Sequence, residues 1–160
     1  MASDNAVPAF MDRFAIRERI DLYIDLLNHR DWNRFGDLWT EDAVWTCSAP
    51  MNLRIESRKA MVEMVSTVQQ YQFGFVFQMG HGVVVDEVAG NRASARHTLH
   101  ILSDRFQMIG IYYDRLVKEA DGVWRFARRD YRITYHDEQP MPGRIFRMLP
   151  DPDYRRLPEP

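Results

Sequence analysis

Residues 110–129, GIYYDRLVKEADGVWRFARR, constrain the fold of this chain more than any other segment. Two runs rich in aromatic and β-branched residues flank an acidic, glycine-containing stretch at 119–122, which is the pattern of a β-hairpin. Because side chains alternate across a strand, Arg129 and Tyr131 are predicted to share one face of the second arm. Polar and aromatic side chains mix on both faces, so the hairpin is predicted either to be solvated or to line a pocket.

Composition narrows the class of protein. A chain of 160 residues is long enough for one domain with its own core. Its net charge of -2 argues against nucleic acid as a partner. A single cysteine, Cys47, excludes an internal disulfide and favours a reducing compartment. No run reaches membrane-spanning length and no signal-peptide pattern opens the chain, so we expect a cytoplasmic protein without a membrane partner.

The chain divides into an N-terminal arm (1–11), one domain (12–139) and a tail rich in proline and arginine (140–160). Apolar residues recurring at helical spacing predict a helix from about residue 12 to 29, and a shorter one over 31–39. A strand is predicted over 43–47 and a loop over 49–53. Ser57 is a candidate N-cap for a third helix, whose apolar stripe includes Met61 and Val68.

The second half alternates as strands over 73–88, 92–102, 106–118 and 123–135. Helices followed by a sheet indicate an α+β domain, in which the helices cover one face of a curved sheet and leave a cavity. Nine methionines and many aromatic residues favour a hydrophobic, ring-bearing ligand.

The histidines do not indicate a metal site. Five histidines are present, without metal-ligand spacing, and alternation sends His97 and His100 to opposite faces of one strand. No dinucleotide or phosphate-binding motif is present. We therefore expect no metal and no cofactor.

Three segments carry a resemblance to a known family: IRERIDLYIDLLNHRDWNRFGDLWTEDAVW, VVVDEVAGNRASARH and GIYYDRLVKEADGVWRFARR. Together they resemble the SnoaL-like branch of the nuclear transport factor 2-like superfamily, over about residues 12–136. The resemblance implies a cone-shaped α+β barrel, with three N-terminal helices packed on a strongly curved mixed/antiparallel sheet around a ligand pocket. This family includes scytalone dehydratase and bile acid 7α-dehydratase, but also non-catalytic subunits, so fold alone does not give function.

The dehydratases of this family use a dyad of Asp and His to move a proton. By the resemblance, Asn28 stands at the position of that Asp and Gln78 at the position of that His. Amides do not titrate near neutral pH, so they cannot replace the dyad as a proton shuttle. The chain therefore either uses another base or has none.

Three other residues are candidates for catalysis. Tyr23 lies on the buried stripe of the first helix, and its phenol could polarise a substrate oxygen. His97, on a strand face that the resemblance turns inward, is the candidate acid/base; the alternative is a buried histidine bound to a neighbour. Arg129 could bind a ligand oxygen, paired with Asp31, or form an ion pair with Asp114 or Asp130 at the sheet edge.

The remaining candidates would bind the substrate. Asn28 and Gln78 would hydrogen-bond it, and His81 has an uncertain orientation because the glycines beside it could support a bulge. The other expected pocket residues are Tyr113, Tyr131, Trp45 and Phe77.

These residues predict a cofactor-independent lyase, catalysing dehydration or a C–C cleavage that releases a small carbonyl such as formaldehyde, or an isomerase. The substrate would be a hydrophobic aromatic or polycyclic alcohol or ketone. Two alternatives stay open: a non-catalytic ligand-binding or accessory subunit, and a polyketide cyclase with Asp31 as its acid. The family habit implies a homodimer.

Overall fold

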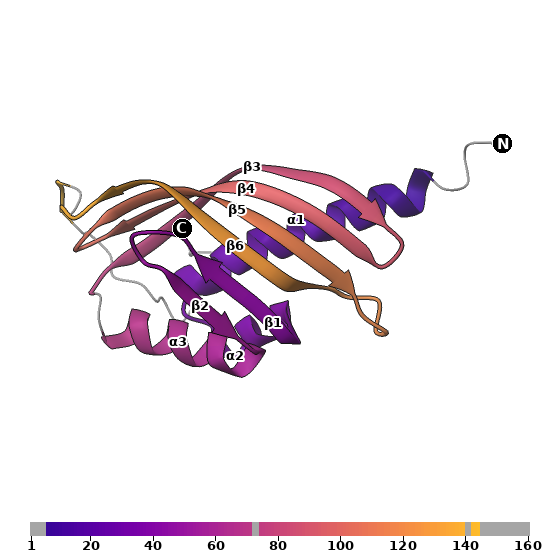
Figure 1. Cartoon of the computed structure of the whole chain (residues 1–160), viewed down its shortest axis with the longest axis horizontal. Helices are drawn as coiled ribbons and strands as arrows, with labels where there is room; N and C mark the ends of the chain where they lie inside the picture. Colours follow the sequence, from indigo (N-terminus) through magenta and orange to yellow (C-terminus); the bar gives the residue numbers. More distant parts are fainter. Residues whose placement is uncertain (1–5, 72–73, 140–141, 145–160) are drawn as a thin grey trace, which may run out of the picture.

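The computed structural model describes residues 6–71, 74–139 and 142–144. The chain folds as α1 (Ala6–Asn28), α2 (Trp32–Phe35), the 3-10 turn η1 (Gly36–Leu38), β1 (Trp39–Cys47), β2 (Leu53–Glu56), α3 (Arg58–Tyr71), β3 (Val76–Ala89), β4 (Arg92–Ser103), β5 (Gln107–Lys118) and β6 (Trp124–Asp137). The α+β cone expected from the sequence is confirmed. In Figure 1, α1 crosses one face of the bent sheet, and α2 and α3 lie beside β1 and β2.

Helix α1 begins at Ala6, earlier than expected, so part of the predicted arm is helical. Pro8 does not prevent this, because a proline in the first turn lacks only an N–H that would have no helical partner. The predicted buried stripe is confirmed by Ile16, Ile20 and Leu27, each at most 1% exposed. Burying such side chains stabilises the fold by about 1.5–3 kcal/mol each.

The remaining helices begin at polar caps. Asp31 Oδ1 accepts a hydrogen bond from the Arg34 N–H at 3.3 Å and caps α2. Ser57 Oγ accepts one from the Ala60 N–H at 3.3 Å and caps α3, as the sequence indicates. Helix α3 buries Met61, whereas the side chain of Val68 and the tail residues 140–141 and 145–160 lie outside the described part.

The strands form one mixed sheet in the order β2-β1-β6-β5-β4-β3. β1 pairs in parallel with β6, and the other neighbours are antiparallel. The short strand β2 was not predicted, and the predicted loop over 49–53 overlaps it only at Leu53. β1 begins at Trp39, earlier than the predicted strand.

Bulges change which side chains face the interior. In β6, Phe126 pairs with Leu116 and Arg128 pairs with Arg115, so Ala127 is an extra residue. Because one extra residue reverses the alternation, Phe126 faces the interior before the bulge and Arg129 faces it after.

A close approach in the same sheet requires glycine. A Cβ on Gly110 would lie 2.5 Å from the Arg132 carbonyl oxygen and 2.6 Å from the Tyr131 ring. Glycine at position 110 therefore lets the Tyr131 ring pack closely against β5. This packing places Tyr131 in the wall of the cavity described next.

Candidate functional site

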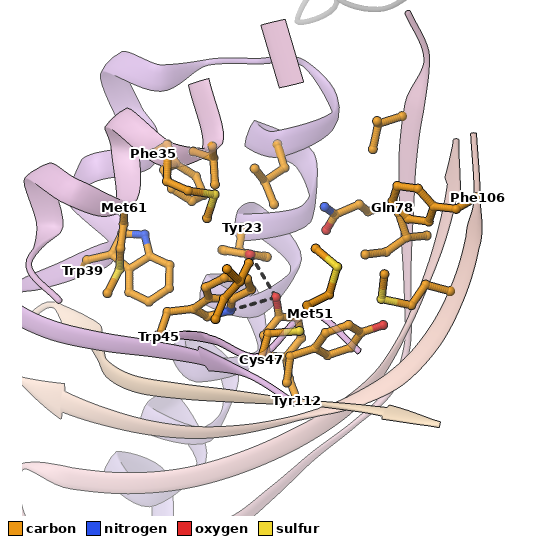
Figure 2. Close-up of a pocket in the computed structure, with 18 residues that line it drawn as sticks. Tyr23, Phe35, Trp39, Trp45, Cys47, Met51, Met61, Gln78, Phe106 and Tyr112 are labelled. Carbon is orange, nitrogen blue, oxygen red and sulfur yellow. Dashed lines mark hydrogen bonds between the residues drawn. The ribbon is translucent and has the colours of Figure 1, made fainter. Parts of the chain in front are cut away.

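A cavity of about 360 Å³ opens between the helices and the sheet. Its wall draws on α1, α2, β1, β2, α3, β3, β4, β5 and β6. Figure 2 shows the side chains that line it. The lining residues are Tyr23, Leu27, Phe35, Trp39, Trp45, Cys47, Met51, Leu53, Met61, Met64, Val65, Val76, Gln78, Ile101, Phe106, Met108, Tyr112 and Tyr131. Most of these are aliphatic, aromatic or thioether side chains, so the cavity suits an apolar ligand with rings.

The described wall contains no carboxylate, imidazole, lysine or arginine side chain. Its thiol, Cys47, is not a ready nucleophile, because burial raises its pKa to about 11. Across the described residues, no group of three or more His, Cys, Asp or Glu side chains could hold a metal ion. The chemistry of the wall therefore depends on neutral hydrogen-bonding groups.

The main polar cluster of the wall joins two phenols and an indole. The hydroxyls of Tyr23 and Tyr112 lie 3.3 Å apart, and Trp45 Nε1–H donates to the Tyr112 hydroxyl at 3.1 Å. Figure 2 shows both bonds as dashed lines. Whichever tyrosine donates to the other, the second keeps its phenolic proton, so the pair has one proton to offer a ligand oxygen.

Both phenols are neutral at physiological pH. Burial raises the pKa of Tyr23, and burial together with the neighbouring Tyr23 raises the pKa of Tyr112 well above its usual value. A neutral phenol donates a hydrogen bond and can stabilise charge that develops on an oxygen.

A guanidinium lies directly behind this pair. The Cζ of Arg129, which is 0% exposed, lies 3.9 Å from the ring centroid of Tyr23 and 4.0 Å from that of Tyr112. Phe126 adds a third ring at 4.1 Å. These cation-π contacts orient both phenols and place a positive charge next to them.

Asp114 balances that charge. It accepts two hydrogen bonds from Arg129, from Nε at 2.7 Å and from Nη2 at 3.2 Å. The expected pairing of Arg129 with Asp31 is wrong, because Asp31 caps α2. The alternative partner, Asp114, is the one found, in the interior and not at a sheet edge.

His97 completes the buried network. Its Nδ1 lies 3.5 Å from Asp114 Oδ2, and its Nε2 lies 3.4 Å from Arg129 Nη2. Because a guanidinium only donates, Nε2 must accept, so the imidazole is neutral with its proton on Nδ1. The ring stacks on Tyr112 with centroids 5.2 Å apart, and it is not part of the cavity wall.

Burial lowers the pKa of His97, and the nearby Asp114 carboxylate opposes the shift. The unfolded chain therefore takes up this proton at a higher pH than the folded protein. Stabilisation from neutral His97 is complete above the unfolded pKa, about 6.5, and is lost as the pH falls below it. We expect the free energy of unfolding of His97→Gln, measured in urea, to fall less between pH 7 and pH 5 than that of the wild type.

The control for this measurement is His100→Gln, which removes a half-buried imidazole three residues along the same strand. We expect it to follow the wild-type pH dependence. Equal acid sensitivity of His97→Gln and the wild type would contradict a buried, neutral His97.

Among the predicted binding residues, Tyr23, Trp45, Gln78 and Tyr131 line the cavity, whereas His97, Arg129, Asn28, His81, Tyr113 and Phe77 do not. The inward orientation expected for Tyr113 is wrong, because Tyr112 pairs with Tyr131 and Tyr113 is 46% exposed on the other face. Phe77 is next to the inward Gln78 and therefore points away from the cavity. His81 is exposed, next to a register shift between it and Val84.

Asn28 fixes a strand and does not line the cavity. Its Nδ2 donates to the Gln78 carbonyl oxygen at 2.8 Å, and its Oδ1 accepts from the Gln78 N–H at 2.7 Å. The side chain thus joins the end of α1 to β3 and sets the position of Gln78.

The sequence analysis did not identify Tyr112 as a residue of the site. It also did not predict that Asp114 is buried beside the site. An unbroken even-numbered alternation from Met108 through Tyr112 to Leu116 was the signal that could have found them. Asp114 concealed it, because a carboxylate is normally taken to mark the solvent face.

The comparisons with known proteins agree with this architecture. The model of the SnoaL-like domain matches residues 9–130. The chain belongs to the SnoaL-like domain family. A search of curated proteins finds no significant match. Within the described residues, no helix is long and apolar enough to cross a membrane.

Solved structures share the SnoaL-like fold at low identity. A hexachlorocyclohexane dehydrochlorinase from Novosphingobium barchaimii LL02 is 18% identical, with a TM-score of 0.75 over 91% of this chain and 99% of that one. A candidate scytalone dehydratase from Novosphingobium aromaticivorans DSM 12444 is 19% identical, with a TM-score of 0.72 over 86% and 97%. The beta subunit of a candidate aromatic-ring-hydroxylating dioxygenase from the latter organism is 16% identical, with a TM-score of 0.64 over 79% and 92%.

Proposed function

We propose that this SnoaL-like protein is a cofactor-independent lyase that acts on a hydrophobic aromatic alcohol or ketone. It would remove water, or a small carbonyl such as formaldehyde, from the substrate. The observation that carries this proposal is the neutral phenol pair, Tyr23 and Tyr112, with one proton to offer in the wall of a largely apolar cavity.

The phenol pair would act on the oxygen whose charge changes in the reaction. Donation to a leaving hydroxyl assists its departure, and donation to a carbonyl stabilises an enolate, which would also serve an isomerase. His97 and Arg129, the other predicted catalytic residues, would act from behind the wall by holding and polarising Tyr112.

The size of the cavity favours the smaller of the predicted substrates. A volume of about 360 Å³ is near the lower end of ligand pockets, which span roughly 300–1,000 Å³. One or two aromatic rings with a short linker therefore fit better than a larger polycyclic molecule. The homodimer expected from the family stays a prediction.

The test is an incubation of the purified full chain with diarylpropane diols, aromatic hydroxyketones and hydroxysteroids, followed by mass spectrometry. We expect one of the aromatic alcohols to lose water or formaldehyde, and boiled protein to leave it unchanged. Turnover of none of them would contradict a lyase.

A second function is supported by a different observation: the described wall has no side chain that could act as a base at neutral pH. This favours a binding protein that carries a hydrophobic ligand without converting it. Ligand-dependent thermal stabilisation without any change in ligand mass would support this second function over the first.

A further inference from the structure

Gln78 presents an unpaired buried acceptor inside the cavity. The residue is 9% exposed, and its Oε1 has no hydrogen-bond partner among the described residues. An unsatisfied buried amide oxygen is costly, so such groups in folded proteins usually have a reason. Figure 2 shows the Gln78 amide pointing from β3 toward the interior of the cavity.

The described residues around Gln78 leave its Oε1 without a hydrogen-bond donor. Its backbone N–H and carbonyl are both hydrogen-bonded to the Asn28 side chain, which anchors β3 at this residue. Across the sheet, Gln78 is opposite Ile101, and Ile101 is opposite Met108. Both of these neighbours are apolar cavity residues and offer Oε1 no donor.

We propose that the Gln78 amide is a second oxygen-binding subsite, which selects ligands carrying a free hydroxyl group in addition to the oxygen held by Tyr23 and Tyr112. This inference rests on the proposed function, since it names the substrate class of the same cavity. The hydroxyl hydrogen is donated to Oε1. A methoxy group at the same place has no hydrogen to donate and leaves Oε1 unpaired, so the site discriminates against it.

The test measures binding, not turnover. Pairs of aromatic ligands that differ only in hydroxyl or methoxy at one position are titrated into the full chain, with fluorescence of Trp39 and Trp45 in the cavity wall as the readout. We expect the wild type to bind the hydroxyl form about 5- to 150-fold more tightly than the methyl ether for one position on the ligand. Gln78→Met is expected to abolish that preference, mainly by weakening the hydroxyl form.

Gln107→Met is the matched control, because Gln107 lies on β5 outside the cavity wall. It should keep the wild-type preference. Without ligand, Gln78→Met should melt a few degrees above the wild type, because an unpaired acceptor is removed, while Gln107→Met should not. Gln78→Leu provides a second apolar variant in case Gln78→Met folds poorly.

Several results would overturn the subsite: an equal affinity of wild type for both members of every pair, a preference that survives Gln78→Met and Gln78→Leu, or no binding of any hydroxylated ligand. The lyase proposal fails separately. A Gln78-dependent preference without turnover keeps the subsite and rejects the lyase, whereas turnover with a preference independent of Gln78 does the reverse.

Discussion

Asp114→Asn is expected to lower the free energy of unfolding by about 3–5 kcal/mol, the largest effect of any single change considered. Asp114 is 2% exposed and is the counterion of the fully buried Arg129. Asparagine keeps the shape and one acceptor but removes the charge. The guanidinium would then remain buried among three aromatic rings without a counterion. An unpaired buried charge lowers the free energy of unfolding.

Urea denaturation followed by circular dichroism measures this loss. Asp86→Asn is the matched control, because it makes the same substitution at the Asp86–Arg96 pair, whose side chains are 41% and 50% exposed. An exposed pair contributes about 0–1 kcal/mol, so the control should differ little from the wild type. Similar losses of unfolding free energy in both variants would show that the buried pair contributes no more to stability than the exposed pair.

Tyr112→Phe is expected to slow turnover of the substrate by about 10²- to 10³-fold, the effect of removing one donor from an oxygen-stabilising site. The Tyr112 hydroxyl is the group that joins Trp45 to Tyr23. Phenylalanine keeps the ring that stacks between His97 and Tyr131, with centroids at 5.2 and 4.6 Å. The rate should therefore fall far more than the affinity for the substrate.

Steady-state kinetics of Tyr112→Phe and Tyr113→Phe on the same substrate separate this effect from a general loss of hydroxyl groups. Tyr113 is the next residue along the strand, and its side chain is exposed on the outer face. We expect Tyr113→Phe to keep the wild-type rate. Full activity in Tyr112→Phe would remove the phenol pair from the mechanism.

The sequence predicted the elements of this fold better than the orientation of their side chains. Helical spacing identified the buried stripe of α1, and alternation identified four long strands. Orientation failed at Tyr113 and Phe77, because the face that a strand residue occupies depends on partners far along the chain. The register that pairs Tyr112 with Tyr131 is set by a bulge, and no local pattern marks Ala127 as its position.

The buried network around Arg129 and Asp114 could not be predicted from the sequence for a different reason. Arg129 and Asp114 were recognised as a possible pair, but as one at a sheet edge, since two charged residues are rarely fully buried. Their burial depends on the three rings around the guanidinium, which come from α1, β5 and β6. Only the assembled fold brings those rings together.

The bulge at Ala127 divides β6 into two parts whose side chains alternate in opposite phase. Before it, Trp124 faces inward and its indole donates to Asp12 of α1, so that part ties the helix to the sheet. After it, Arg129 and Tyr131 serve the cavity. Deleting one residue at 127 would turn both of these side chains outward while leaving Trp124 in place. The one extra residue at 127 thus decides which side chains of the second part of β6 reach the interior, and it keeps the Arg129 guanidinium beside the buried Asp114 carboxylate.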